Sequence, residues 1–191
     1  MSGPVMVVVA GPSGSGKSAV FPVAESGHAS FNVDDRCREL HGSSIGIPPA
    51  VRTQAQAECE AFIAYHTATR SSFAVETTLR SDIAIRQAAT AKAAGFATRM
   101  IFVATPDVEL NVRRVIGRAL LGGHSAPPDR IREIYAGSLA NLRLAIAVFD
   151  NVLVYDNGVD GAPARLVCEF REGKLHGAAE LPAWLRAAID G

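Results

Sequence analysis

The residues from Gly11 to Ser18 could hold a nucleotide, because they read GPSGSGKS and satisfy the pattern G-x-x-x-x-G-K-[ST] in full. Glycines in such a loop let the backbone curl so that successive N–H groups face phosphate oxygens. Lys17 is expected to reach the β- and γ-phosphates, and the Ser18 hydroxyl to ligate Mg²⁺. The loop therefore predicts binding of ATP and Mg²⁺. Its members are Gly11, Pro12, Ser13, Gly14, Ser15, Gly16, Lys17 and Ser18.

An acidic pair, Asp34 and Asp35, follows the second predicted strand, at residues 28–33. A carboxylate at a strand end beside the phosphates can accept the proton of an attacking hydroxyl. We favour Asp34 as this base. Asp35 competes for the role and is otherwise predicted to contact the substrate. The alternative is that the pair only caps the helix that follows.

Glu76 ends the third predicted strand, in the sequence ETTLRS, and hydroxyl and guanidinium groups come directly after it. One carboxylate with hydroxyls and an arginine suits a polar sugar or a nucleotide. Glu76, Thr78 and Arg80 are therefore predicted to bind the substrate. For Glu76, a loop cap or a ligand to Mg²⁺-bound water is the alternative.

Two arginines are predicted to lie on a lid over the site, at about residues 113–128. Arg114 and Arg118 are four residues apart in a predicted helix and so share one face, close to Gly122 and Gly123. Such a pair can clamp a transferring phosphoryl group when a lid closes. The alternative is a solvated basic face. His124 lies in the same segment, and both a structural and a functional role are open for it.

Asn157 follows the last core strand, in the sequence DNG. In P-loop kinases the loop after this strand lies near the adenine, so we expect Asn157 to contact the base.

These residues need a frame of strands alternating with helices, and the hydrophobic pattern supplies one. Residues 5–10 (VMVVVA) form a continuous β-branched run, which is typical of a central parallel strand covered on both faces. Thr105, Pro106 and Asp107 start a helix well, with Thr105 as the cap and Val112, Val115 and Ile116 on its buried stripe. The further strands are expected at 72–76, 97–104 and 152–155. The helices are expected at 17–25, 50–69, 82–94, 106–121, 129–148 and near the C-terminus.

The expected fold is accordingly α/β, with the three layers of a P-loop NTPase kinase. Its mainly parallel five-stranded sheet carries helices on both faces, and residues 165–174 add a C-terminal hairpin. With 191 residues and no linker-like segment, the chain is expected to form a single domain.

Composition excludes several classes of protein. Lys and Arg number 19, as do Asp and Glu, so no strong field attracts nucleic acid or an anionic membrane. The three cysteines are scattered and are expected to be buried and reduced in a cytoplasmic protein. The guanine-reading N-K-x-D of a GTPase is absent, and LLGGH at 120–124 has a leucine where an ABC-type ATPase has its serine.

Taken in order, the motifs resemble the compact branch of the zeta-toxin-like kinases, from about Val5 to Lys174. They are GPSGSGKS, NVDD, ETTLRS, VRRVIGR, GGH with following prolines, and SLANL leading to VLVYDNG. The resemblance implies a toxin that uses ATP to phosphorylate the sugar 3′-hydroxyl of UDP-N-acetylglucosamine. It also implies a small antitoxin protein as partner. A kinase for another small hydroxyl substrate, and a nucleotide-dependent ATPase switch, are the alternatives.

The resemblance also assigns roles. Asp34 matches the catalytic base, Lys17 and Ser18 the ATP and Mg²⁺ contacts, and Arg114 and Arg118 loosely the lid arginines. The E-x-T-x-R that holds the nucleotide sugar in the longer toxins matches Glu76, Thr78 and Arg80. Two positions depart from the compact branch: Ile134 stands where Arg is usual, and Arg80 where Ser is common.

Overall fold

The computed structural model describes residues 3–120, 126–177 and 180–190. The predicted Gly122-Gly123 hinge and His124 lie outside these ranges. The cysteines Cys37, Cys59 and Cys168 are free and buried, as the sequence predicts. Along the described ranges, none of the helices has the length and apolar character that crossing a membrane would require.

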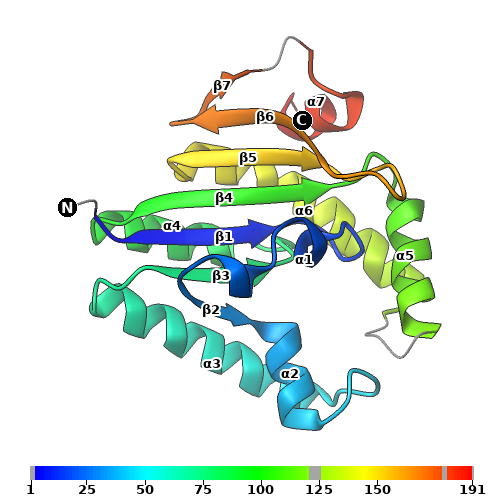
Figure 1. The fold of residues 1–191 in the computed structure, drawn as a ribbon, viewed down its shortest axis with the longest axis horizontal. Helices are drawn as coiled ribbons and strands as arrows, with labels where there is room; N and C mark the ends of the chain where they lie inside the picture. The colour runs from blue at the N-terminus through cyan, green and yellow to red at the C-terminus, as the bar shows by residue number, and fades with distance from the viewer. Residues whose placement is uncertain (1–2, 121–125, 178–179, 191) are drawn as a thin grey trace.

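A seven-stranded sheet in the order β2-β3-β1-β4-β5-β6-β7 forms the centre of the molecule (Figure 1). The first five strands run parallel, and β6 and β7 add an antiparallel hairpin to the same sheet. The mainly parallel sheet of five strands is thus confirmed, and the hairpin extends it. The strands are β1 (Val5–Ala10), β2 (Ala29–Asn32), β3 (Phe73–Thr77), β4 (Ala97–Ala104), β5 (Asn151–Asp156), β6 (Arg165–Arg171) and β7 (Lys174–His176).

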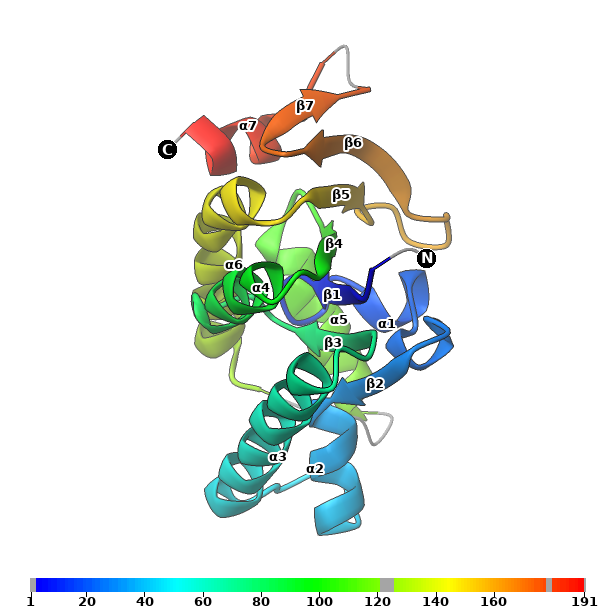
Figure 2. The same ribbon diagram turned by 90° about the vertical axis from the view of Figure 1, so that its left-hand side faces the viewer.

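Helices cover the two faces of the sheet unequally (Figure 2). The long helices α3 (Pro49–Ala68), α4 (Ile83–Ala93) and α6 (Pro128–Val148) lie on one face with α7 (Ala183–Asp190). They enclose the larger core, which includes Phe73, Phe102 and Leu142. The other face carries the short α1 (Lys17–Val20) and the 3₁₀ helix η1 (Val23–Glu25), over a smaller cluster around Val7 and Val103.

The predicted helix over residues 17–25 is wrong, because the chain forms α1 and η1 with a break between them. Pro22 has no backbone N–H and disfavours a helical conformation of the residue before it. Phe21 accordingly is extended, with φ at −147°, and α1 ends at Val20.

Helices α2 (Val33–His41) and α5 (Val108–Leu120) lie beyond the carboxyl ends of the strands (Figure 1). Asp107, and not Thr105, caps α5: its Oδ1 accepts the Glu109 N–H at 2.9 Å. The predicted buried stripe of this helix holds at Val112 and Val115 but is wrong at Ile116, which is 42% exposed. Asn111 is fully buried beside Val112 instead.

Helix α2 starts directly after β2, and Asn32 caps it. The Asn32 Oδ1 accepts the N–H of Asp34 at 2.9 Å and of Asp35 at 3.4 Å. Both acids therefore lie in the first turn of α2, where a negative charge is also favoured by the helix dipole.

We predict that Asn32→Ala lowers the free energy of unfolding by about 1 kcal/mol, because two N–H groups of α2 lose their acceptor. Urea unfolding measures this change. Asn32→Ser is the matched control, since serine is an equally good cap, and it should retain most of the stability. Equal unfolding midpoints for the alanine and serine variants would contradict the capping role.

Candidate active site

The P-loop, Asp34 and Glu76 lie at the ends of β1, β2 and β3, and these parallel strands end at the same edge of the sheet (Figure 1). The register of three strands places them there. Glu76 of β3 lies opposite Val9 of β1 and opposite Asn32 of β2. The chain therefore leaves β1 into the P-loop, and β2 into Asp34, on either side of Glu76.

The P-loop glycines are required by close packing as well as by their backbone angles. Gly11, Gly14 and Gly16 all have positive φ, between 81° and 140°. A Cβ on Gly11 would lie 2.0 Å from the Val103 carbonyl oxygen, and a Cβ on Gly14 would lie 2.6 Å from that of Asn111. Any side chain at these positions would push the loop away from β4 and α5.

Lys17 is buried under the loop, with 8% of its surface exposed. Its Nζ donates to the Pro12 carbonyl at 3.3 Å and lies 3.9 Å from Glu76 Oε1. The Ser18 hydroxyl donates to the other Glu76 oxygen at 3.1 Å. The predicted phosphate-binding lysine, the predicted Mg²⁺ ligand and Glu76 thus form one contiguous cluster.

Burial favours the uncharged forms of both Lys17 and Glu76. It lowers the pKa of Lys17 below its ordinary 10.5, although the carboxylates of Glu76 and Asp34 act in the opposite direction, and nearby Arg118 lowers it further. Burial likewise raises the pKa of Glu76 above its ordinary value, with Lys17 and Ser18 opposing the shift. An incoming triphosphate with Mg²⁺ would supply both residues with opposite charge.

The oxygens of Ser18 and Glu76 fit a magnesium ion. Mg²⁺ prefers hard oxygen ligands and in nucleotide sites takes one or two protein ligands together with phosphate oxygens. The Ser18–Glu76 contact supports the alternative in which Glu76 serves the Mg²⁺ site and not the acceptor. Binding of the substrate by Glu76 stays a prediction.

Asp34 and Asp35 differ in their surroundings although both are exposed. Asp35 Oδ1 accepts a hydrogen bond from Arg38 Nη2 at 2.8 Å. Asp34 raises the pKa of Lys17, whereas both Asp34 and Asp35 raise that of Glu76. The alternative that the pair caps α2 is wrong, because Asn32 is the cap and both acids lie in the first turn of the helix.

The ETTLRS segment turns sharply at Leu79, which is fully buried and has a left-handed φ of 55°. Asn141 Nδ2 holds this turn by donating to the Leu79 carbonyl at 3.0 Å. Thr78 is half-buried, and Arg80 is exposed at the rim of a cavity of about 390 Å³. That cavity is lined by Arg80, Ser81, Ile83, Arg130, Glu133 and Ile134. The two positions that depart from the compact branch therefore line the same cavity.

The two predicted lid arginines differ in their contacts. Arg114 donates to the Asn157 carbonyl at 2.9 Å and pairs with Asp160 at 2.5 Å, so it joins α5 to the loop after β5. Arg118 is exposed and near enough to lower the pKa of Lys17. Of the two, Arg118 is the one that affects the pKa of the P-loop lysine, and its role as a lid arginine stays a prediction.

The Asn157 side chain is hydrogen-bonded to the P-loop. Its Nδ2 donates to the Ser15 carbonyl at 2.8 Å, so the adenine contact remains a prediction for Oδ1. Asn111 makes the same kind of bond to the Ser13 carbonyl at 2.7 Å, and our sequence analysis missed it. A signal was present, because Asn111 is a polar residue on the apolar stripe of an amphipathic helix.

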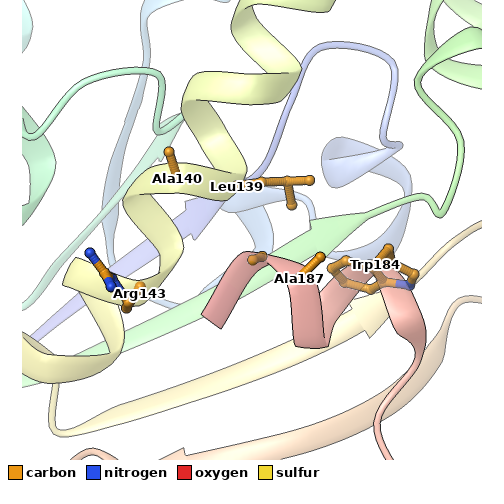
Figure 3. Close-up of a pocket in the computed structure, with 6 residues that line it drawn as sticks. Leu139, Ala140, Arg143, Trp184 and Ala187 are labelled. Atoms are coloured by element: carbon orange, nitrogen blue, oxygen red, sulfur yellow. The ribbon is translucent and has the colours of Figure 1, made fainter. Parts of the chain in front are cut away.

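A second cavity, of about 340 Å³, lies between α6 and α7 (Figure 3). It includes none of the predicted site residues. Its lining consists of Leu139, Ala140, Arg143, Trp184, Ala187 and Ala188.

Comparisons with known proteins agree with this architecture. The model of the Zeta toxin family matches residues 2–161. A solved chain of the PezAT chromosomal toxin–antitoxin system of Streptococcus pneumoniae is similar, with a TM-score of 0.65 and 18% identity, over 100% of this chain and 80% of that one. The structure of AvrRxo1-ORF1:-ORF2 with ATP has a TM-score of 0.72 at 16% identity, over 91% of this chain and 60% of that one.

A putative kinase from Chloroflexus aurantiacus J-10-fl is similar as well, with a TM-score of 0.55 and 16% identity, over 72% of this chain and 79% of that one. No curated protein sequence matches the chain. This chain spans about three fifths of the AvrRxo1-ORF1 complex chain that it resembles. The solved structures confirm the predicted P-loop kinase-like fold.

We predict that nucleotide affinity falls as the pH rises through the pKa of Lys17, because only the ammonium form pairs with phosphate. Since burial lowers this pKa, the loss should begin below pH 10.5 and approach about tenfold per pH unit above the pKa. Titrations of ATP at a series of pH values measure it, with circular dichroism to verify folding. Lys17→Arg is the control, because a guanidinium does not titrate in this range. A midpoint at or above 10.5 would contradict the prediction.

Proposed function

The chain belongs to the zeta toxin family, and from this membership we propose that it is a kinase that transfers the γ-phosphoryl group of ATP to a sugar hydroxyl. The acceptor that we propose is UDP-N-acetylglucosamine or a related nucleotide sugar. The observation that carries the proposal is the cluster of Lys17, Ser18 and Glu76 under the P-loop. The Asp34 carboxylate is near enough to this cluster to raise the pKa of Lys17.

In the proposed reaction the acceptor hydroxyl oxygen forms a bond to the γ-phosphorus while the bond to the β–γ bridging oxygen breaks, and ADP leaves. Asp34 takes the proton of the hydroxyl. Lys17 pairs with the β- and γ-phosphates, and Arg118 adds positive charge beside them. Bound Mg²⁺, held through Ser18 and Glu76, would neutralise charge that develops on the phosphate oxygens.

Asp34 is the better base of the acidic pair. The Asp35 carboxylate is engaged by Arg38, whereas that of Asp34 lies within electrostatic reach of Lys17. Asp35 is left as a contact to the acceptor, together with Thr78 and Arg80.

A small antitoxin protein is proposed as partner of the chain. Membership of the family supports it, as does the similarity to a structure from a toxin–antitoxin system. Co-purification of the chain with the product of a neighbouring small gene, followed by loss of kinase activity in the complex, tests it.

Phosphate transfer from labelled ATP to a panel of nucleotide sugars and free sugars tests the function. We predict that Asp34→Asn lowers kcat by about 10²–10⁴-fold, because a general base is lost, while the affinity for ATP changes little. Asp35→Asn is the comparison variant: as a lost contact to the acceptor it should raise the KM for the acceptor, while kcat stays within a few fold. Transfer to no acceptor, or equal rates for wild type and Asp34→Asn, would refute the kinase. Formation of ADP without any acceptor would favour the ATPase switch.

The cavity shared by Arg80 and Ile134 offers a test of acceptor binding. We predict that Arg80→Ser raises the KM for the acceptor by roughly 10- to 100-fold, as expected when a hydrogen bond to a charged group of about 1.5–3 kcal/mol is lost. Because residue 134 lines the same cavity, Ile134→Arg in that background should restore part of the loss. Steady-state kinetics with varied acceptor and saturating ATP measure both. An unchanged KM in Arg80→Ser would rule out the contact.

A further inference from the structure

Two asparagine side chains donate hydrogen bonds to backbone carbonyls of the P-loop. Asn111, in the first turn of α5, donates from Nδ2 to the Ser13 carbonyl at 2.7 Å. Asn157, directly after β5, donates from Nδ2 to the Ser15 carbonyl at 2.8 Å. Both bonds cross large distances in the sequence, of 98 and 142 residues, so tertiary structure alone creates them.

The loop needs such donors because of how it binds phosphate. When the N–H groups of a P-loop face the ligand, its carbonyls face away from the ligand toward the protein. A carbonyl at that surface needs a donor, since an unpaired buried polar group is costly. The two asparagine amides supply donors for alternate carbonyls of the loop. They do so without occupying the N–H groups that the phosphates require.

Each asparagine is itself held in orientation. The Thr105 hydroxyl lies against Asn111 Oδ1, so the amide of Asn111 presents its NH₂ group to the loop. Arg114 donates to the Asn157 carbonyl at 2.9 Å and pairs with Asp160 at 2.5 Å, which fixes the loop after β5. Asn111 and Arg114 both belong to α5, so this helix supports both contacts.

Close packing leaves the loop little alternative. A Cβ on Gly14 would lie 2.6 Å from the Asn111 carbonyl oxygen, and a Cβ on Gly16 would lie 2.3 Å from Asn157 Nδ2. The loop therefore packs closely against Asn111 and Asn157, the two residues whose side-chain amides donate hydrogen bonds to it.

We propose that Asn111 and Asn157 are positioning residues that hold the P-loop in its phosphate-binding conformation before the nucleotide arrives. Helix α5 is their common support. The proposal rests on the proposed function only in taking ATP with Mg²⁺ as the ligand, and it does not depend on the acceptor.

The test replaces each asparagine by leucine, which has a similar size but no donor. Calorimetric titration of the purified chain with ATP and Mg²⁺, without acceptor and well below the melting temperature, should show a Kd about tenfold higher for Asn111→Leu and for Asn157→Leu. A loss of that size corresponds to about 1.4 kcal/mol. If Asn111→Leu does not fold, Asn157→Leu carries the test, because its residue is only partly buried. The ligand is then inorganic triphosphate with Mg²⁺, which lacks the base that Asn157 Oδ1 is predicted to contact.

Asn141→Leu is the matched control. Asn141 makes the same kind of bond, from Nδ2 to the Leu79 carbonyl at 3.0 Å, but in the ETTLRS segment. It should lower the melting temperature without changing the Kd for ATP. A merely structural role of Asn111 and Asn157 predicts lower melting temperatures with wild-type Kd values, and that result would overturn the proposal. So would an equal rise of the Kd in Asn141→Leu.

The readout separates this inference from the proposed function. A chain that binds ATP, responds to the two leucine substitutions and phosphorylates no acceptor would support the positioning role while refuting the kinase. A chain that phosphorylates a nucleotide sugar but binds ATP equally well in all variants would do the reverse.

Discussion

The buried contact between Lys17 and Glu76 is the interaction on which the site depends. An ammonium group with little exposure to water is stable only near negative charge, and here one carboxylate lies 3.9 Å away and a second, Asp34, lies within electrostatic reach. The same burial that lowers the pKa of the lysine strengthens its attraction for a phosphate, because water screens the charge less. The site thus favours an anionic ligand.

Parallel strands bring these charges together. Because β1 lies between β3 and β4, the turn that leaves it is flanked by the carboxyl ends of both. The register of Val9 with Glu76, and of Glu76 with Asn32, fixes which side chains border the P-loop. The N-terminal cap of α2 then sets the direction in which Asp34 leaves β2.

Helix α5 has a larger part in the site than an outlying lid would have. Its buried Asn111 contacts the P-loop, and its Arg114 holds the loop after β5. Arg118, one turn further on, is exposed and lowers the pKa of Lys17. One helix therefore supports the nucleotide loop and also carries the arginine that acts on the charge of Lys17. Such a division of roles explains why two arginines at helical spacing have different contacts.

Local chemistry let the sequence determine much of this protein. The P-loop pattern, the β-branched run of β1, and the strand–helix alternation required no knowledge of distant contacts, and the parallel sheet with its hairpin was predicted correctly. The positions of Lys17, Ser18 and Asp34 at one sheet edge also followed, since parallel strands end on the same side. Pro22 was a local signal as well, and the wrong helix over residues 17–25 came from overlooking it.

Tertiary structure alone decided the partners of polar side chains. Asn157 bonds to the P-loop, Arg114 pairs with Asp160, and Glu76 contacts Ser18, and each pair is separated by at least 46 residues along the chain. A hydrogen bond between two elements forms only when the donor–acceptor distance is correct to within a few tenths of an ångström. No periodicity in a sequence encodes that distance. Residue types and spacing therefore determined which chemical groups the site contains. Packing determined which of these groups contact one another and which side chains hold the P-loop in place.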